Sequence, residues 1–268
     1  MRDKVVIVTG ASSGIGLATA EEFAKIGSKV VMAARSEEKI KDLENELKKK
    51  GYEAYAVKTD VSNQDNCRNL IEKTIEKYGK IDILINNAGI SMRALFSNVD
   101  IDVLKKLMDV NFWGTVYCSK YALPYLLKTK GSLVGVSSIA GIQGLPGRTG
   151  YSASKFALHG LLETIRIENL RKGLHVMILT AGFTKTDIRK KALKENGTPQ
   201  GITPRNEEKH MMPEQVAKAI IRALRKKKRH KILTLEGQLL AIFQRLIPNL
   251  CDLVAYKKLA REQDSPFV

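Results

Sequence analysis

Short apolar segments rich in β-branched residues alternate along the chain with longer segments whose apolar residues recur at helical spacing. Seven apolar segments are candidate strands: residues 5–9, 30–33, 55–58, 81–86, 132–137, 175–180 and 231–235. The first helical segments are residues 17–26 and 39–50. Alternating strands and helices form βαβ units, and strands without polar alternation are buried on both faces of a parallel sheet. The pattern predicts an α/β fold, a doubly wound (Rossmann) arrangement around a seven-stranded parallel sheet.

The domain organisation is expected to be simple. No internal repeat, Gly/Ser-rich linker or low-complexity segment divides the 268 residues, so a single domain is expected. Residues 1–235 carry the strand and helix pattern, and residues 236–268 are expected to be a helical extension of the same domain. Residues 196–212 contain several Gly and Pro and predict a loop between two helices that is able to act as a lid.

Composition narrows the class of protein. With 44% hydrophobic residues the chain is able to bury a full core. Cys67, Cys118 and Cys251 stand far apart, which argues against a disulfide framework or a thiolate zinc site and favours a reducing compartment. The chain has no segment that resembles a signal peptide or reaches the roughly 18 apolar residues of a membrane span, so a cytoplasmic location is expected.

The charge is strongly positive and unevenly placed. The chain has 45 Lys and Arg against 28 Asp and Glu, a net charge of +17. Much of the excess lies at residues 185–194 and 222–231. A solvated helix face explains such runs most simply, but they also favour an anionic partner: nucleic acid, an acidic membrane surface or a phosphorylated ligand.

An apolar segment follows the second basic run. Its members recur at mixed helical spacings: Leu239, Leu240, Ile242, Phe243, Leu246, Ile247, Leu250, Leu253 and Val254. Three interpretations stay open: the segment covers a substrate pocket, packs against a second subunit, or makes peripheral contact with an anionic membrane through residues 222–254.

A glycine-rich turn directly follows the first predicted strand and opens a helix. It reads TGASSGIG, with the spacing GxxxGxG. Such glycines let a dinucleotide pyrophosphate approach the backbone and the free N–H groups of the helix start. An ordinary glycine-rich turn between strand and helix is the alternative. The candidate cofactor contacts are Gly10, Ser12, Ser13, Gly14, Ile15 and Gly16.

The end of the second predicted strand bears on the choice of dinucleotide. Residues 33–36 read Ala-Ala-Arg-Ser, without the acidic residue that binds the adenosine ribose in an NAD site. Arg35 instead offers a guanidinium fork to a 2′-phosphate, and Ser12 is able to add a donor. NADP(H) is therefore expected rather than NAD(H). The alternative is that Arg35 is an ordinary surface residue.

Tyr151 and Lys155 stand four residues apart in a predicted helix, and therefore on one face. A nearby cation favours the phenolate and lowers the tyrosine pKa from about 10 toward neutrality, where proton transfer is most useful. In a chain with 8 tyrosines, roughly one such pair arises by chance, so the context has to decide.

The context is an ordered set of motifs: TGASSGIG, then Asn86-Asn87-Ala88-Gly89, Asn111, Ser137-Ser138 and Tyr151-Ser-Ala-Ser-Lys155. This order resembles the classical short-chain dehydrogenase/reductase family over residues 4–235. Within that family the chain looks most like the NADP-dependent subgroup that contains the 11β-hydroxysteroid dehydrogenases and the dehydrogenase/reductase member 7 enzymes.

The resemblance implies an activity. It is an NADP(H)-dependent hydride transfer between nicotinamide and a carbonyl or secondary alcohol, on an apolar small molecule such as a steroid, a long-chain ketone or a 3-oxoacyl derivative. Residues 185–212 would form part of the substrate pocket. No metal and no nucleic acid are expected, and a homodimer or homotetramer through the long helices is implied. The alternative is a non-catalytic dinucleotide-sensing protein that uses its basic surface for binding.

The resemblance also assigns roles to single residues. Tyr151 would be the general acid and base, Lys155 would bind the nicotinamide ribose and tune Tyr151, Ser138 would bind the substrate oxygen, and Asn111 would hold a proton-relay water. Ser138 is preferred to Ser137 because it stands thirteen residues before Tyr151, as the family serine does. Further cofactor contacts are implied for Asp60, Val61, Asn87, Ala88, Gly89, Gly182, Thr184 and Thr186.

Simpler structural roles stay open for three of these residues: a helix kink for Asn111, a helix cap for Asp60 and a local turn for Ser138. One position departs from the family pattern. Ala181 precedes Gly182 where the family usually has proline, and the freed backbone is expected to loosen the loop on the nicotinamide side.

Overall fold

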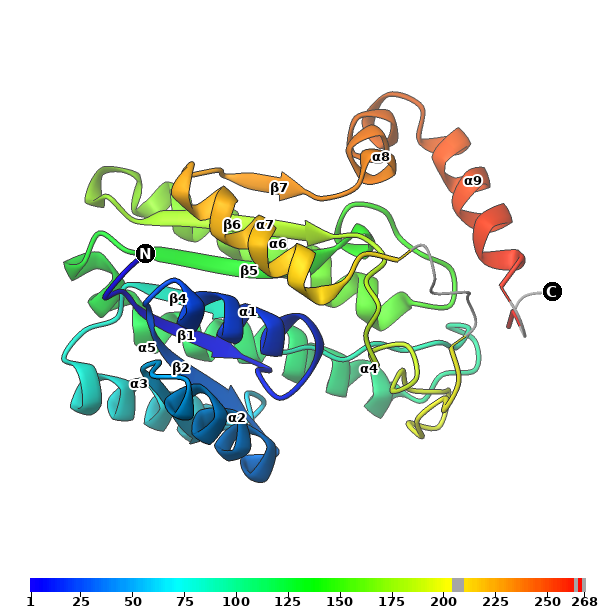
Figure 1. Ribbon diagram of the computed structural model, residues 1–268. Helices are drawn as coiled ribbons and strands as arrows, with labels where there is room; N and C mark the ends of the chain where they lie inside the picture. Colours follow the sequence, from blue (N-terminus) through cyan, green and yellow to red (C-terminus); the bar gives the residue numbers. More distant parts are fainter. Residues whose placement is uncertain (204–209, 263–264, 267–268) are drawn as a thin grey trace.

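The computed structural model describes residues 1–203, 210–262 and 265–266. Among these residues, seven parallel strands form one sheet in the order β3-β2-β1-β4-β5-β6-β7, which confirms the predicted doubly wound arrangement (Figure 1). The strands are β1 (Val5–Thr9), β2 (Lys29–Ala34), β3 (Ala54–Lys58), β4 (Ile83–Asn86), β5 (Ser132–Ser138), β6 (His175–Ala181) and β7 (His230–Ile232). The strand order reverses between β1 and β4, and the crevice at that reversal is where open α/β sheets bind ligands.

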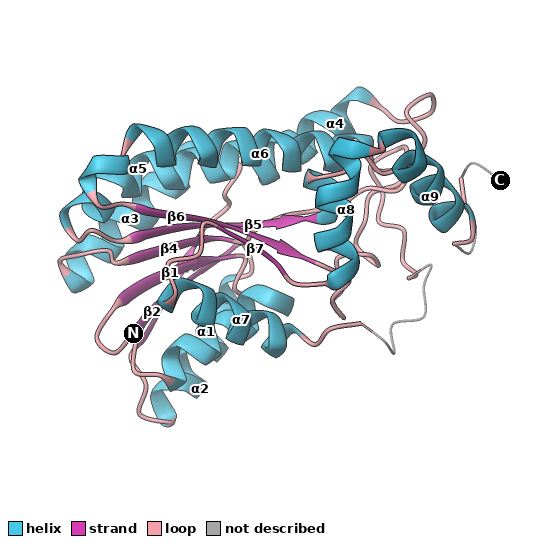
Figure 2. Ribbon diagram, turned by 90° about the horizontal axis from the view of Figure 1, so that it is seen from above, coloured by secondary structure: helices cyan, strands magenta, loops and turns pink. Residues whose placement is uncertain are grey.

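Helices cover both faces of the sheet. They are α1 (Gly14–Lys25), α2 (Glu37–Lys49), α3 (Gln64–Tyr78), α4 (Ile101–Met108), α5 (Gly114–Lys128), α6 (Thr149–Glu168), α7 (Pro213–Arg225), α8 (Leu235–Leu246) and α9 (Pro248–Ala260). Three short helical turns join them: η1 (Asp109–Trp113), η2 (Ile139–Gly141) and η3 (Leu170–Lys172). Helices α1, α2 and α7 lie on one face, and α3, α5 and α6 lie on the other (Figure 2).

The two faces of the sheet carry separate hydrophobic clusters. Val6 and Val8 of β1 point into the cluster beneath α1, α2 and α7, whereas Val5 and Ile7 point into the cluster beneath α3, α5 and α6. Neighbouring side chains of a strand alternate between faces, and both faces of β1 are covered, so every residue of this strand is buried. This explains why the strand segments lack a polar alternation.

The seventh strand ends earlier than predicted. The apolar pattern places a strand at residues 231–235, but β7 ends at Ile232. The Thr234 side chain accepts a hydrogen bond from the backbone N–H of Gly237 (3.2 Å) and caps α8, which begins at Leu235. A capping side chain stabilises the start of a helix. Here the cap ends the strand although the segment is apolar.

The helix expected before the loop at residues 196–212 does not form within the described residues. After β6 the chain runs through turns that are tied to other elements by short backbone bridges. Leu193 donates its N–H to Ser91 O (2.9 Å), and its carbonyl accepts from the Arg93 N–H (2.8 Å). These tertiary bonds satisfy backbone groups that a helix would otherwise pair internally. Residues 204–209 of the loop lie outside the described residues.

The extension at residues 236–268 forms the helices α8 and α9, joined at Ile247 into a hairpin that projects beyond β7 (Figure 1). Residues 263–264 and 267–268 of the extension lie outside the described part of the chain. Just after α9, the buried carboxylate of Glu262 forms ion pairs with Arg93 (3.5 Å) and Arg148 (3.2 Å). These bonds tie the far end of the hairpin to the body of the domain.

Candidate active site

A cavity of about 910 Å³ lies at the carboxyl ends of the strands. Its wall contains most of the site residues expected from the sequence: Gly10, Ser12, Ser13, Ile15, Arg35, Asp60, Val61, Asn87, Ala88, Gly89, Ser138, Tyr151, Lys155, Gly182, Thr184 and Thr186. Gly14, Gly16 and Asn111 do not line it. The structure thus brings together residues that stand as much as 176 positions apart, from Gly10 to Thr186.

The glycine-rich turn is shaped by close packing against Asn87. Gly10 has a φ of +67°, a left-handed conformation that favours glycine. A side chain at Gly16 would meet the Gly10 carbonyl, and its Cβ would lie 2.5 Å from Asn87 Nδ2. Asn87 Nδ2 donates to Thr9 O (2.9 Å), and the Asn87 N–H donates to Thr9 Oγ1 (3.0 Å). Gly16 therefore packs closely against the back of the turn. The start of α1 faces the cavity, as a pyrophosphate site requires.

Basic residues follow β2 at the rim of the cavity. Arg35, Ser36 and Lys39 line this end, and all three are exposed. The first carboxylate after β2, Glu37, is held by Lys41 at 2.8 Å and Lys58 at 3.6 Å. The hydrogen bond and charge of Lys41 hold the pKa of Glu37 below its ordinary value. The rim thus presents basic and hydroxyl groups, of which sequence reasoning identified Arg35 but missed Ser36 and Lys39.

Asp60 lines the cavity and does not cap the following helix. Its Oδ1 accepts hydrogen bonds from the N–H (3.0 Å) and the hydroxyl (2.7 Å) of Ser62. The cap of α3 is Asn63, whose side chain accepts from the Asn66 N–H at 2.9 Å. The capping alternative for Asp60 is therefore wrong, and its carboxylate shapes the turn beside the cavity wall.

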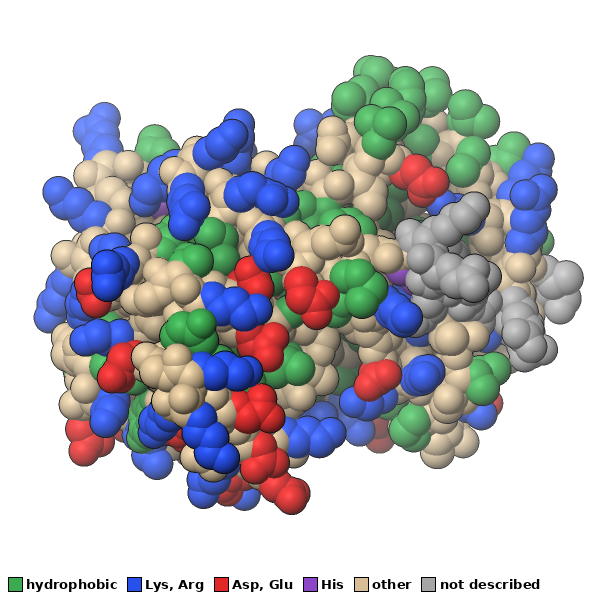
Figure 3. Space-filling view, in the orientation of Figure 1, with side chains coloured by type: hydrophobic (Ala, Val, Ile, Leu, Met, Phe, Trp, Pro, Cys, Tyr) green, Lys and Arg blue, Asp and Glu red, His purple; other side chains and the backbone are tan. Residues whose placement is uncertain are grey.

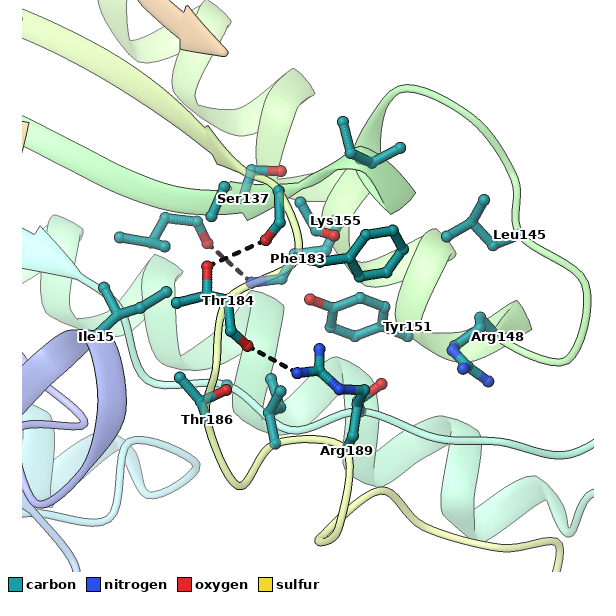
Figure 4. A pocket seen from close by; sticks show the side chains of 18 of the residues that line it. Ile15, Ser137, Leu145, Arg148, Tyr151, Lys155, Phe183, Thr184, Thr186 and Arg189 are labelled. Atoms are coloured by element: carbon teal, nitrogen blue, oxygen red, sulfur yellow. Dashed lines mark hydrogen bonds between the residues drawn. The ribbon is translucent and has the colours of Figure 1, made fainter. Parts of the chain in front are cut away.

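Tyr151 lies in the first turn of α6, and its phenol faces the centre of the cavity (Figure 4). Burial raises the pKa of Tyr151 above its ordinary value of 10.0. A hydrogen bond with the Ser138 side chain and the positive charges of Arg148 and Arg189 act in the opposite direction and favour the phenolate. The two arginines come from different segments, and the family motif did not point to either.

Lys155 lies one helical turn after Tyr151 and is buried. Its Nζ donates to Val136 O at 3.0 Å and lies 5.8 Å from the centroid of the Tyr151 ring. Burial lowers the pKa of Lys155 to about 8. The ammonium is therefore fixed between β5 and Tyr151 at the cavity wall, where a ribose hydroxyl would find a donor.

The neighbouring serines at the end of β5 face different partners. Ser138 lines the cavity, and its hydroxyl accepts a hydrogen bond from the Ala140 N–H at 3.3 Å, so Ser138 has both the turn role and a place in the cavity wall. The Ser137 hydroxyl forms a 2.7 Å hydrogen bond with Nε2 of His159. This geometry supports the choice of Ser138 over Ser137.

Asn111 lies in the π-helical turn η1 and is completely buried behind the cavity. Its Oδ1 accepts from the Ile90 N–H (2.8 Å), and its Nδ2 donates to Ile90 O (3.0 Å) and Ser154 Oγ (2.9 Å). The amide fixes the chain after β4 and the start of α6 relative to each other. The kink expected as its structural alternative is present, because a π-turn interrupts the helix here.

The loop after Ala181 is held in place by hydrogen bonds. The Lys185 N–H donates to Met211 O (2.9 Å), and the Met211 N–H donates to Phe183 O (3.0 Å). An Arg189 nitrogen also donates to Thr184 O at 2.8 Å. Ala181 itself is paired with Ser138 as the last residue of β6. These bonds restrain the loop that was expected to be loose without proline.

The far side of the cavity is apolar. The α8–α9 segment contributes Leu239, Leu240, Phe243, Ile247, Leu250 and Val254, and Leu145 and Phe183 also line the cavity. The pocket-covering interpretation of the apolar segment therefore agrees with the geometry. Sequence reasoning missed Leu145 and Phe183, although the apolar residue directly after Gly182 was a signal for the second.

The residues of the cavity fit a nicotinamide dinucleotide. The glycine cradle and the helix start suit a pyrophosphate, the basic rim suits the adenosine end, and Lys155 suits a ribose. Tyr151 and Ser138 present two hydroxyl groups beside the apolar wall. Such a pair is able to bind an oxygen atom of an apolar compound and to exchange a proton with it.

Comparisons with known proteins agree with this arrangement. Residues 4–197 match the sequence model of the family described as short chain dehydrogenase. The chain is 33% identical to the Uncharacterized oxidoreductase YxnA of Bacillus subtilis (strain 168), over 98% of this chain and 74% of that protein. It is 39% identical to 11-beta-hydroxysteroid dehydrogenase-like 2 of Arabidopsis thaliana, over 72% of this chain; the match spans 63% of the plant protein.

Solved structures show the same fold. An alcohol dehydrogenase of the archaeon Thermococcus sibiricus, complexed with 5-hydroxy-NADP, superposes with a TM-score of 0.76 at 28% identity, over 87% of this chain and 96% of that one. A short chain dehydrogenase/reductase of Burkholderia phymatum, in complex with NAD, gives 0.83 at 24% identity, over 93% and 95% of the two chains, and this likeness concerns the fold alone. The two structures hold different dinucleotides.

Proposed function

Since the chain belongs to the short-chain dehydrogenase/reductase family, we propose that it is an NADP(H)-dependent oxidoreductase that interconverts a carbonyl and a secondary alcohol on an apolar small molecule. One observation carries the proposal. The hydroxyl groups of Tyr151 and Ser138 line one cavity with a dinucleotide cradle at one end and apolar side chains at the other.

A nicotinamide held in this cavity would supply the hydride for the carbonyl carbon. Tyr151 donates its phenolic proton to the carbonyl oxygen, and Ser138 donates a hydrogen bond to the same oxygen. The charges of Arg148 and Arg189 stabilise the phenolate that remains. Lys155 holds the ribose beside Tyr151. In the reverse direction the phenolate accepts the proton of the alcohol.

The preference for NADP(H) is supported by the rim that follows β2. Arg35, Ser36 and Lys39 all line the cavity, and Glu37 is held by two lysines. A 2′-phosphate would gain charge-assisted hydrogen bonds there, whereas an unmodified ribose would find no carboxylate at positions 33–36.

An apolar substrate is supported by the wall formed by α8 and α9. Leu240, Phe243 and Phe183 all line the cavity. A steroid, a long-chain ketone or a 3-oxoacyl chain would bury apolar surface against these side chains.

Two further features of the protein belong to the proposal. A homodimer or homotetramer is supported by exposed apolar side chains on α6 and η3, where Ile167 is 67% and Leu170 is 72% exposed. A cytoplasmic location is supported by the three free thiols, all of them buried. Light scattering of the purified protein measures the first, and fractionation of the source cells measures the second.

The test is a titration of the purified protein with NADPH and with NADH, followed by the decay of NADPH absorbance with a series of ketones and oxoacyl thioesters. Tighter binding of NADPH and turnover of an apolar ketone are expected. Binding without turnover across the series would contradict the catalytic proposal, and equal affinity for both dinucleotides would contradict the cofactor preference.

A further inference from the structure

The hairpin of α8 and α9 has an apolar outer face as well as the inner face that lines the cavity. On α8, Leu235, Ile242 and Leu246 lie at i, i+7 and i+11 in one stripe, and none of the three lines the cavity. Leu235 is 71% exposed and Leu246 is 69% exposed. Hydrophobic side chains gather on this projecting helix (Figure 3).

The stripe on α9 passes from apolar to basic residues. Leu253 is exposed and does not line the cavity. Lys257, one helical turn later, and Arg261, which caps the helix, are also exposed. Long basic side chains beside an apolar stripe keep their charge at the level of lipid headgroups while the apolar residues enter the interface.

The acidic residues of the hairpin are engaged by other side chains. The pairs are Glu236 with Lys258, Asp252 with Gln143, and Glu262 with Arg93 and Arg148. On the outer face the exposed charges are those of Arg245, Lys257 and Arg261. The face is therefore apolar with a basic border.

The neighbouring edge of the molecule is basic as well. β7 is an edge strand of the sheet and leads directly into α8. Residues 222–231 before and within it contain seven Lys and Arg and no Asp or Glu. Long-range attraction to an anionic surface grows with each such charge.

We propose that the outer face of the α8–α9 hairpin docks onto the surface of a bilayer that contains anionic lipids. No helix within the described ranges is both long and apolar enough to cross a bilayer, so the hairpin lies on the surface. A second copy fits this face less well, because a twofold interface would bring Arg245, Lys257 and Arg261 against their own copies in a protein of net charge +17. The inference concerns a face that the proposed reaction does not use.

Co-sedimentation of the full chain with vesicles tests the proposal. One set of vesicles is phosphatidylcholine alone, and the other contains about one third phosphatidylglycerol. We expect binding to the anionic vesicles that weakens as salt is raised, and at least about tenfold weaker binding to the neutral ones. Absence of binding to anionic vesicles at low salt, or equal binding to both sets, would overturn the proposal.

Paired variants separate the apolar and basic parts of the face. Ile242→Glu with Leu246→Glu, at positions that do not line the cavity, is expected to weaken vesicle binding by at least about tenfold. The control is Ile101→Glu, an equally exposed apolar residue on α4, which should bind as the unchanged protein does. Circular dichroism verifies that each variant is folded.

For the charges, Lys257→Glu with Arg261→Glu is compared with Lys73→Glu with Lys77→Glu, which has the same i, i+4 spacing on α3. Only the first pair should lose the preference for anionic vesicles. Light scattering tests the alternative that a second copy of the chain binds this face. If Ile242→Glu with Leu246→Glu converts a dimer into a monomer while vesicle binding is unchanged, the face is an interface between copies, and the proposal is wrong.

Discussion

Glu262 forms a 3.2 Å ion pair with Arg148, which precedes Tyr151 by three residues. The two partners stand 114 residues apart, and the Glu262 side chain is only 4% exposed. Arg93 adds a second guanidinium at 3.5 Å. The end of the α8–α9 hairpin is thereby bonded directly to the start of the helix that carries the proposed catalytic tyrosine.

Breaking this cluster should be costly. Glu262→Gln removes the charge of a buried carboxylate that pairs with Arg93 and Arg148, so we expect the free energy of unfolding to fall by about 3 kcal/mol. Urea denaturation followed by circular dichroism measures this. The matched control is Glu236→Gln, which removes an exposed ion pair with Lys258 and should change stability by less than about 0.5 kcal/mol. Equal effects of the two changes would refute the structural role of Glu262.

The proton-transfer role of Tyr151 predicts a selective loss. Tyr151→Phe removes the hydroxyl but keeps the ring, so turnover should fall by at least about 100-fold while NADPH still binds. Steady-state rates and NADPH fluorescence measure the two quantities. Tyr125→Phe, on α5 and outside the cavity wall, serves as the control and should leave both unchanged. A Tyr151→Phe protein that retains the full rate would exclude the assignment.

The rim after β2 predicts the cofactor preference. Arg35→Asp replaces a donor to the 2′-phosphate by a carboxylate suited to ribose hydroxyls, so the ratio of NADPH to NADH affinity should fall by at least about tenfold. Parallel titrations measure it. Lys50→Asp makes the same charge change at the end of α2, away from the cavity, and should not alter the ratio. An unaltered ratio in the Arg35 variant would eliminate the role.

The apolar wall predicts a dependence on chain length. Each methylene that enters the apolar part should raise kcat/KM by about fourfold. Phe243→Ala removes wall area and should weaken this rise for long ketones while it leaves the shortest ones unchanged. Initial rates over an alkyl ketone series measure the slope. Phe96→Ala, an exposed phenylalanine outside the cavity, is the control. A slope that is the same in both variants would contradict the prediction.

Partly buried histidines predict a loss of stability in acid. Burial, followed by the charges of His230 and Lys155, lowers the pKa of His159 to about 4, and burial also lowers the pKa of His175 and His230. The unfolded chain takes up these protons at a higher pH, near 6.5. Above pH 6.5 these histidines are neutral in the folded and the unfolded chain and do not reduce stability. The free energy of unfolding therefore declines as the pH falls from about 6.5 toward about 4.

Urea denaturation at several pH values measures this decline. His159→Gln, which still offers a side-chain donor to Ser137, should reduce the slope between pH 6.5 and 4. Asp82 titrates in a separate window, because its pKa lies below the ordinary value of 3.8. A slope unchanged by the His159 variant would assign the acid sensitivity to other groups.

The parts of the fold that were predicted correctly depend on local patterns. β1 is apolar throughout because both faces of the sheet are covered, and this signal is visible in a single window of sequence. The glycine-rich turn and the Tyr151 motif are also local, and residues of both line the cavity. The end of β7 was misplaced because the cap at Thr234 competes with an apolar segment, and short-range pattern does not decide between them.

The parts that were missed depend on contacts between distant positions. Arg148 and Arg189 act on Tyr151 from two segments, and nothing in the spacing of either residue marks it. A helix was expected before the loop at residues 196–212, but Leu193 pairs its backbone with Ser91 and Arg93 instead. The orientation of the α8–α9 hairpin stayed open because its apolar residues serve two faces, one toward the cavity and one toward the exterior.

The two sides of the cavity are synthesised at different times, because their elements stand in different parts of the chain. All seven strands precede α8, so a ribosome completes the sheet, the glycine-rich turn and the Tyr151 helix before it makes the apolar wall. A nascent chain is thus able to form the dinucleotide cradle while the opposite side of the cavity is still missing. The α8–α9 side of the cavity matures last, when Glu262 emerges and bonds to Arg148.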